Sequence, residues 1–182
     1  MTANQPQWPR EWLMTDERLG ERLWEAIDEL PHGGGIVFRH YSLPADGRLR
    51  LGAKVAAAAR DRGLVLAVAG SRRLATELGA ALLHNPDSPG GLPCSMPVHD
   101  EGQARAARDI GAALVFIAPM FPTRSHPGVS LLDVNQAEAL ARLAACPAIA
   151  LGGMDRGRFL DLDAAIPGAF HGYAGIDCWL KS

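Results

Sequence analysis

Short apolar runs alternate with segments of helical periodicity along the whole chain, and this alternation most restricts what the chain can fold into. The apolar runs are rich in Val, Ile, Leu and Phe, which favours strands. Eight of them predict strands, at Glu11–Thr15, Ile36–Tyr41, Val65–Ala69, Ala81–His84, Cys94–Val98, Ala113–Pro119, Ala148–Leu151 and Ala169–Ala174. Strands buried on both faces and joined by helices predict a parallel sheet.

The segments between the strands carry helix signals. Asp16, Asp100 and Asn135 stand where an N-terminal cap is expected, and Gly79 and Gly111 stand where a helix would end before the next strand. The predicted helices are Asp16–Leu30, Arg48–Arg60, Ser71–Gly79, Asp100–Gly111, Asn135–Ala144 and Arg156–Ala165.

Eight strand units favour an α/β fold of the (β/α)₈ type, a TIM barrel, forming a single domain over residues 1–182. The length of 182 residues is below the ~250 typical of this barrel. Several helices must therefore be short, and the last strand leaves little more than Asp177–Ser182 after it. An open, doubly wound sheet is the alternative.

Composition restricts the partners. The net charge of -2, with no basic stripe, gives no reason to expect nucleic acid, and no run approaches the ~20 apolar residues that span a membrane. The N-terminal segment is polar and lacks the apolar run of a secretion signal, so we expect a cytoplasmic protein. Cys94, Cys146 and Cys178 are widely spaced and are expected to be free thiols. A homo-oligomer is possible.

In a barrel of this type the site lies at the carboxyl ends of the strands, often with a phosphate between the loops after strands seven and eight. Gly152-Gly153 follows the seventh predicted strand, and Gly175-Ile176 follows the eighth. Glycine lets backbone N–H groups approach an anion without hindrance from a Cβ. A tight turn with no ligand is the alternative, but two such sites together predict a small-molecule phosphate as the ligand.

The loop after the sixth strand, Ala118–Gly128, contains three prolines that stiffen it. It presents Thr123, Arg124, Ser125 and His126 at low entropic cost. His126 is the only one of these groups that can take up and release a proton near neutral pH, which predicts a general acid/base. The alternative is a surface histidine without a catalytic role.

Other polar residues also end strands. His84 and His99 are more often hydrogen-bonded residues of a barrel rim than catalysts. Strand alternation predicts that Arg39 and Tyr41 face one side and His40 the other.

Five segments carry a resemblance to a known family: residues 12–17, 38–41, 118–123, 150–154 and 172–176. The chain resembles the thiamine phosphate synthase family, which includes the related thiazole tautomerases. Ala118-Pro119-Met120-Phe121-Pro122-Thr123 is similar to the family segment Gly-Pro-x-Phe-x-Thr. Ala150-Leu151-Gly152-Gly153-Met154 is similar to its Ala-Ile-Gly-Gly-Ile loop.

The resemblance implies a (β/α)₈ barrel that binds a thiazole phosphate. Gly152, Gly153, Gly175 and Ile176 match the positions that hold this phosphate, and Thr123 matches a binding position on the loop after strand six. Family synthases join the thiazole phosphate to an aminopyrimidine pyrophosphate, with Mg²⁺ and basic residues stabilising the departing pyrophosphate.

The departures from the family pattern fall on the pyrophosphate half of the site. Tyr41 and His126 replace two lysines, and Ala69-Gly70 replaces an Asn-Asp pair, so the expected Asp ligand of Mg²⁺ is missing. Arg124, Arg72 or Arg73 could replace the missing cations.

These departures favour a tautomerase-like proton transfer that requires no cofactor and no metal ligand, with His126 as acid/base and Arg39 binding a substrate carboxylate. The protein is then an enzyme, an isomerase. A synthase (a transferase) and a non-catalytic binder of thiamine phosphates are the alternatives.

Overall fold

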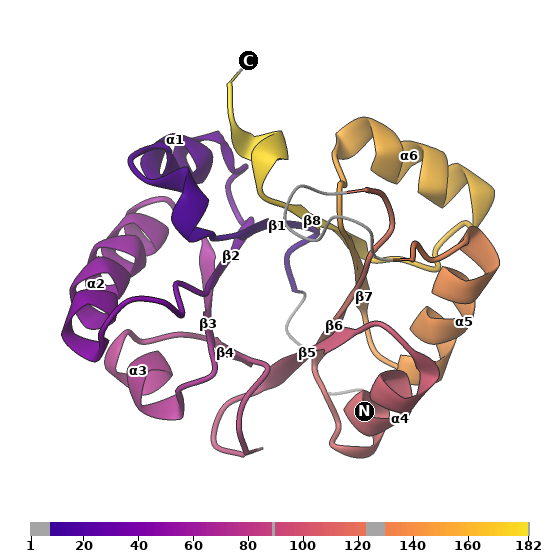
Figure 1. The fold of residues 1–182 in the computed structure, drawn as a ribbon, viewed down its shortest axis with the longest axis horizontal. Coiled ribbons are helices and arrows are strands. Elements are labelled where there is room, and N and C mark those ends of the chain that lie inside the picture. The colour runs from indigo at the N-terminus through magenta and orange to yellow at the C-terminus, as the bar shows by residue number, and fades with distance from the viewer. Residues whose placement is uncertain (1–7, 89, 123–129, 182) are drawn as a thin grey trace.

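The computed structural model describes residues 8–88, 90–122 and 130–181. In these residues eight parallel strands close into a barrel, because β1 (Glu11–Met14) pairs with β8 (Gly172–Gly175) as well as with β2 (Gly35–Phe38). Figure 1 shows the strands as a central ring with the helices outside it. This closure confirms the (β/α)₈ barrel and excludes the open, doubly wound sheet.

The remaining elements follow the predicted order and are short. The strands are β3 (Val65–Ala69), β4 (Leu82–His84), β5 (Cys94–Val98), β6 (Leu114–Ile117) and β7 (Ala148–Leu151). The helices are α1 (Arg22–Glu29), α2 (Ala45–Asp61), α3 (Arg72–Glu77), α4 (Glu101–Asp109), α5 (Val134–Ala144) and α6 (Arg156–Ala165). Within the described residues β4 leads to β5 without a helix, and β8 is followed only by a 3₁₀ helix, η2 (Asp177–Trp179). Because these two connections lack an α-helix, 182 residues are enough to complete the barrel.

The interior of the barrel is packed by one group of buried side chains, and a second group fills the space between strands and helices. The inner group is Trp12, Met14, Val37, Ala67, Leu82, Leu114, Phe116, Ile149 and Ala174. The Trp12 ring lies against Gly35, where a Cβ would overlap it, and meets Phe116 edge-on at 5.6 Å. Its indole N–H donates to Pro9 O, before β1, so the Trp12 side chain is directed towards the amino end of the barrel.

The helix predicted at Asp16–Leu30 is wrong as a single helix. Asp16 is a cap, as expected, but it caps the 3₁₀ helix η1 (Glu17–Leu19) by accepting from the Arg18 N–H at 3.0 Å. Gly20, with a φ of 49°, then interrupts the chain before α1. This break at a glycine places Arg18 at the barrel mouth.

Other predicted boundaries also shift. Asp133, not Asn135, caps α5, because Asp133 and Gln136 exchange side-chain and backbone hydrogen bonds in a capping box. Asp100 caps α4 as predicted, and Gly79 and Gly111 have φ of 65° and 66°, as expected of glycines that end helices.

Candidate active site

A cavity of about 680 Å³ opens at the carboxyl end of the barrel. Residues in or following β1, β2 and β4 to β8 line it, whereas in the described chain nothing from β3 or the turn after it does. Its charged and imidazole side chains are Arg18, Arg39, His84, His99, Asp155, Arg158 and Asp177. Most of the other lining residues are apolar, proline or glycine, a composition and size that suit a small organic ligand.

The turn after β7 packs closely on the loop after β6. Gly152 and Gly153 have φ of 96° and 60°, and a Cβ on Gly153 would lie 2.8 Å from Phe121 Cβ. Phe121 N–H donates to Gly152 O at 2.9 Å, and Met120 N–H donates to Leu151 O at 3.0 Å. Both glycines line the cavity, so the turn is required for loop packing and is also open to a ligand.

The end of β8 lines the same cavity through Gly175 and Ile176. The Cys178 thiol occupies the space beside Gly175 that a side chain there would need. The glycine turns predicted to face one phosphate thus share a cavity, although their role in binding remains a prediction. Cys94, Cys146 and Cys178 are free, as expected.

The N-terminus of α6 stands at this edge of the cavity. Asp155 caps the helix by accepting from the Arg158 N–H at 2.9 Å. The Arg158 guanidinium lies 4.8 Å from the centroid of the Phe121 ring and donates to Gly153 O. The cavity is lined by three arginines against two aspartates, so its charged side chains favour an anion.

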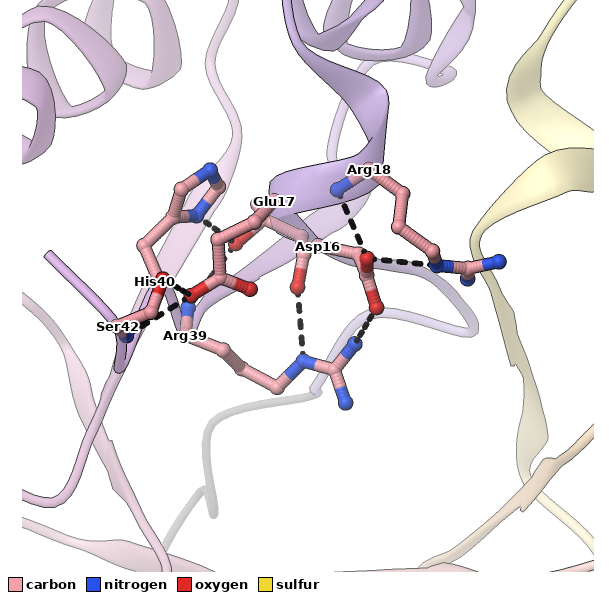
Figure 2. Close-up of polar contacts among 7 residues, drawn as sticks. Asp16, Glu17, Arg18, Arg39, His40 and Ser42 are labelled. Carbon is pink, nitrogen blue, oxygen red and sulfur yellow. Dashed lines mark hydrogen bonds and ion pairs between the residues drawn. The ribbon is translucent and has the colours of Figure 1, made fainter. Parts of the chain in front are cut away.

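Arg39 also lines the cavity, as predicted, and Figure 2 shows its contacts. Its Nε donates to Thr15 O at 2.8 Å, and its Nη2 lies 3.3 Å from Asp16 Oδ2. Asp16 Oδ1 accepts from Arg18 Nε at 2.8 Å, so this carboxylate bridges two guanidinium groups (Figure 2). Among the described residues Nη1 of Arg39 has no hydrogen-bond partner, which leaves it for a ligand.

The charge states of this cluster follow from its contacts. Burial would raise the pKa of Asp16, but hydrogen bonds from Arg18 and the nearby guanidinium charges outweigh it, and that pKa is lowered. Burial lowers the pKa of Arg39, an effect that the Asp16 carboxylate opposes. Arg39 stays protonated because an arginine titrates far above neutral pH. Asp16 therefore fixes the orientation of a permanent cation.

Two histidines line the cavity on neighbouring strands. His99 Nδ1 lies 2.8 Å from Ala118 O. A carbonyl only accepts, so Nδ1 of His99 carries a proton and donates it to this bond. His84 Nδ1 lies 3.0 Å from Ser95 Oγ, and burial together with the Arg39 charge lowers the pKa of His84 to about 3.

The prediction that Tyr41 faces the pocket together with Arg39 is wrong. The second strand ends at Phe38 rather than Tyr41, and His40, with a φ of 37°, turns the chain. Strand alternation therefore does not extend to Tyr41. His40 does lie away from the cavity, stacked on Phe38 and 3.0 Å from Thr15 Oγ1 through its Nδ1.

Tyr41 packs instead on Arg48, whose guanidinium lies 5.2 Å from the Tyr41 ring centroid. Arg48 donates to Ala69 O at 2.7 Å and to Arg39 O at 3.0 Å. Arg48 and Tyr41 together form a cover over the ends of β2 and β3, here called the Arg48–Tyr41 cover. Figure 1 places α2, which carries Arg48, outside these two strands.

The end of β3 does not suit a divalent cation. Ala69-Gly70 offers no carboxylate, and the Ala69 carbonyl already accepts from a guanidinium. Within the described residues no group of three or more His, Cys, Asp or Glu side chains is arranged to hold a metal ion. The end of β3 is therefore suited to its contact with the Arg48 side chain and not to binding Mg²⁺.

Several predicted site residues lie outside the described residues, namely Thr123, Arg124, Ser125 and His126. Arg72 and Arg73 do not line the cavity, and Arg72 donates to Ser88 O at 3.1 Å. Sequence reasoning missed Arg18, Asp155 and Arg158. Asp155 could have been found as a helix cap directly after the glycine turn, and Arg158 as its neighbour one turn later.

Fold and cavity together define a (β/α)₈ barrel with a cavity of small-molecule size at the carboxyl ends of its strands. The fold is similar to that of thiamine phosphate pyrophosphorylase from Pyrococcus furiosus, with a TM-score of 0.75 at 19% identity over 92% of this chain and 85% of that one. Residues 94–165 match the family model described as thiamine monophosphate synthase.

Two curated relatives extend this match. The thiamine-phosphate synthase of Methylococcus capsulatus is 28% identical over 181 residues, which cover 87% of this chain and 81% of that protein. The thiamine biosynthesis bifunctional protein ThiM/ThiE of Symbiobacterium thermophilum is 30% identical over 146 residues, covering 71% of this chain. The match spans only 30% of that longer protein. These matches support a relationship of the chain to the thiamine monophosphate synthase superfamily.

Proposed function

We propose that this protein binds a thiazole phosphate in the barrel cavity and transfers a proton on its ring, as a thiazole tautomerase does. The observation that carries the proposal is the asymmetry of the cavity. It opens onto the glycine turns after β7 and β8, and in the described chain it does not reach the end of β3. A cavity of this shape suits one phosphorylated substrate.

In this proposal the phosphate lies between the two glycine turns. Gly152 and Gly153 allow their backbone to approach an anion, and Gly175 and Ile176 face the same space. The N-terminus of α6 and the guanidinium groups of Arg18 and Arg158 supply positive charge at this edge. The apolar lining contributed by Met14, Phe116 and Leu151 would receive the ring.

Arg39 would bind the substrate carboxylate across the cavity. Its guanidinium is already oriented by Thr15 and Asp16, so little side-chain entropy is lost when a ligand binds Nη1. Asp16 keeps the charge of Arg39 partly balanced in the free protein. The site would then hold the two anionic groups of the substrate in different places, the carboxylate at Arg39 and the phosphate at the glycine turns.

Proton transfer requires a group that can take up and release a proton near neutral pH. His126 remains our first candidate from the sequence. His99 is a second candidate, because its Nδ1–H donates to Ala118 O and its Nε2 is left to exchange a proton in the cavity. His84 is unsuitable because its lowered pKa keeps the ring neutral.

Thiamine phosphate synthesis is the second candidate function. The names of the matching relatives favour it, since the Methylococcus capsulatus protein is a thiamine-phosphate synthase. The Arg48–Tyr41 cover argues against it, because it closes the side of the mouth where the family resemblance would put metal and pyrophosphate. No step of the proposed proton transfer uses a metal ion.

The test measures two reactions on the purified protein. We expect interconversion of the tautomers of a thiazole carboxylate phosphate, followed by NMR, and no release of pyrophosphate from thiazole phosphate with the aminopyrimidine pyrophosphate and Mg²⁺. His126→Asn should abolish the interconversion, and His99→Asn should do so if His99 is the acid/base. His32→Asn, at an exposed position before β2, is the control. Pyrophosphate release without tautomer interconversion would replace this proposal with the synthase.

A further inference from the structure

The cavity contains one deeply buried polar side chain that the proposed proton transfer does not use. His84, at the end of β4, is 6% exposed and lines the cavity beside Phe116, whose ring it meets edge-on at 5.3 Å. Its neighbour across the β4–β5 ladder is Ser95, which is fully buried. A buried imidazole in an apolar wall requires a partner for each of its nitrogens.

The serine determines which imidazole nitrogen carries the proton. In the described part of the chain, the Ser95 hydroxyl makes one hydrogen bond, to His84 Nδ1 at 3.0 Å. A buried hydroxyl proton left without an acceptor costs free energy, so Ser95 donates to Nδ1. Nδ1 must then be unprotonated, and the proton of the neutral ring lies on Nε2.

Nε2 points to the cavity. No described residue accepts a hydrogen bond from Nε2. Among the described residues, Arg62 Nε is the only fully buried side-chain nitrogen or oxygen without a partner, so Nε2 of His84 is not fully buried. His84 Nε2 is therefore accessible from the cavity, which His84 lines. The result is an N–H donor aimed out of an otherwise apolar wall made with Met14 and Phe116.

We propose that His84 is a specificity-determining residue, whose Nε2–H donates a hydrogen bond to an acceptor on the ligand ring, a heteroaromatic nitrogen or an oxygen bound to the ring. This inference rests on the proposed function and adds to it what the apolar wall selects. A site built to donate a hydrogen bond discriminates against an analogue that lacks the acceptor, because the buried donor is then left unpaired. Ser95 acts as a positioning residue through His84.

The first measurement is ¹⁵N NMR of the His84 imidazole in the ligand-free protein near neutral pH. We expect a protonated Nε2 and an unprotonated Nδ1, and we expect Ser95→Ala to weaken this preference. A ring protonated on Nδ1 alone, or on both nitrogens, would overturn the inference whatever the protein binds.

The second measurement is calorimetric binding of thiazole phosphate and of its thiophene analogue, which lacks the ring nitrogen. We expect wild type to prefer the thiazole by about tenfold, His84→Gln to keep part of the preference, and His84→Leu to lose it. Equal discrimination by wild type and His84→Leu would overturn the role of His84. Failure of the wild type to bind either phosphate would instead refute the proposed function, and the NMR result would still decide the tautomer.

Discussion

The two sides of the barrel mouth are built differently from the same kind of strand ends. After β7 and β8, glycine turns leave backbone exposed to the cavity, and side chains approach from α6 and η1. After β2 and β3, the Arg48–Tyr41 cover uses an arginine to satisfy two strand-end carbonyls. The first side is open to an anion, and the second already contains its own cation.

This difference indicates how one barrel can serve one or two substrates. A cation supplied by a side chain is permanent and cannot leave with a product, whereas a metal ion enters and leaves with a pyrophosphate. The Arg48–Tyr41 cover therefore suits a protein whose substrate does not extend to the end of β3. Changes on the two sides should have unequal effects on ligand binding.

The largest effect is expected on the open side, from Gly153→Ala. The alanine would have to keep a φ of 60°, and its Cβ would lie 2.8 Å from Phe121 Cβ. We expect roughly 1–3 kcal/mol of destabilisation and a loss of thiazole phosphate affinity of about tenfold or more, as hydrogen bonds to a charged phosphate are lost. Chemical unfolding and calorimetry would measure both.

Gly79→Ala is the matched control for this substitution. Gly79 has a φ of 65°, but nothing lies within 4 Å of the added Cβ. It should cost only the strain of the left-handed backbone, about 1 kcal/mol, and leave affinity unchanged. Equal effects of the two substitutions on affinity would show that the turn after β7 does not contact the ligand.

The next effect is a pH dependence that comes from His84. Burial, with the Arg39 charge, lowers its pKa from 6.5 to about 3. Between these values the unfolded chain binds a proton that the folded protein does not, so stability is complete above pH 6.5 and falls on acidification. We expect this contribution to fall by up to about 1.4 kcal/mol per pH unit.

His84→Gln removes this titration while keeping a polar group of similar reach. As the pH falls from 7 to 4, the unfolding free energy of the wild type should therefore decrease more than that of the variant. A difference that does not change with pH would show that the His84 ring is not buried in its neutral form. The carboxylates of the protein titrate in both wild type and variant, so their contributions cancel in the comparison.

A smaller effect is expected from Arg39→Lys. Lysine keeps the charge but cannot make the hydrogen bonds to Thr15 O and Asp16 while also presenting a planar N–H to a ligand. We expect about a tenfold weaker affinity for the thiazole carboxylate phosphate and little change for the thiazole phosphate without the carboxylate. The control is Arg105→Lys, in an exposed ion pair with Glu101. Equal losses for both ligands would contradict carboxylate binding by Arg39.

The smallest effect is expected on the covered side, from Tyr41→Ala. Tyr41 is 57% exposed and contributes a cation–π contact to Arg48, typically worth about 0.5–1 kcal/mol. Unfolding should show a loss of this size, and calorimetry should show unchanged thiazole phosphate affinity. A strong loss of affinity would mean that the ligand extends across the cover.

Much of the fold was accessible from sequence because strand and helix signals are local. The eight apolar runs, the cap at Asp100 and the glycine after α3 each act within a few residues. The cap of α5 was misplaced because Asp133 and Asn135 can both cap a helix, and only the reciprocal bond with Gln136 decides between them. The break at Gly20 was missed because the apolar residues on both sides of it keep a helical spacing, and only the φ of 49° shows that the chain turns there.

The site was predicted less completely because its contacts join distant residues. The Arg48–Tyr41 cover depends on where β2 ends, which the apolar pattern did not show. The His84–Ser95 pair could have been predicted, because the two residues are partners in the β4–β5 register. The role of His126 is still a sequence prediction, since that residue lies outside the described residues.

Within the described residues, no helix has the length and apolar character to cross a bilayer.

The most direct measurement is a calorimetric titration of the protein with thiazole phosphate and, separately, with the aminopyrimidine pyrophosphate in the presence of Mg²⁺. If the glycine turns bind one phosphate and the Arg48–Tyr41 cover closes the other side, the thiazole phosphate binds at one equivalent and the pyrophosphate does not compete with or add to it. Tight, Mg²⁺-dependent binding of the pyrophosphate beside a bound thiazole phosphate would contradict this division of the barrel mouth.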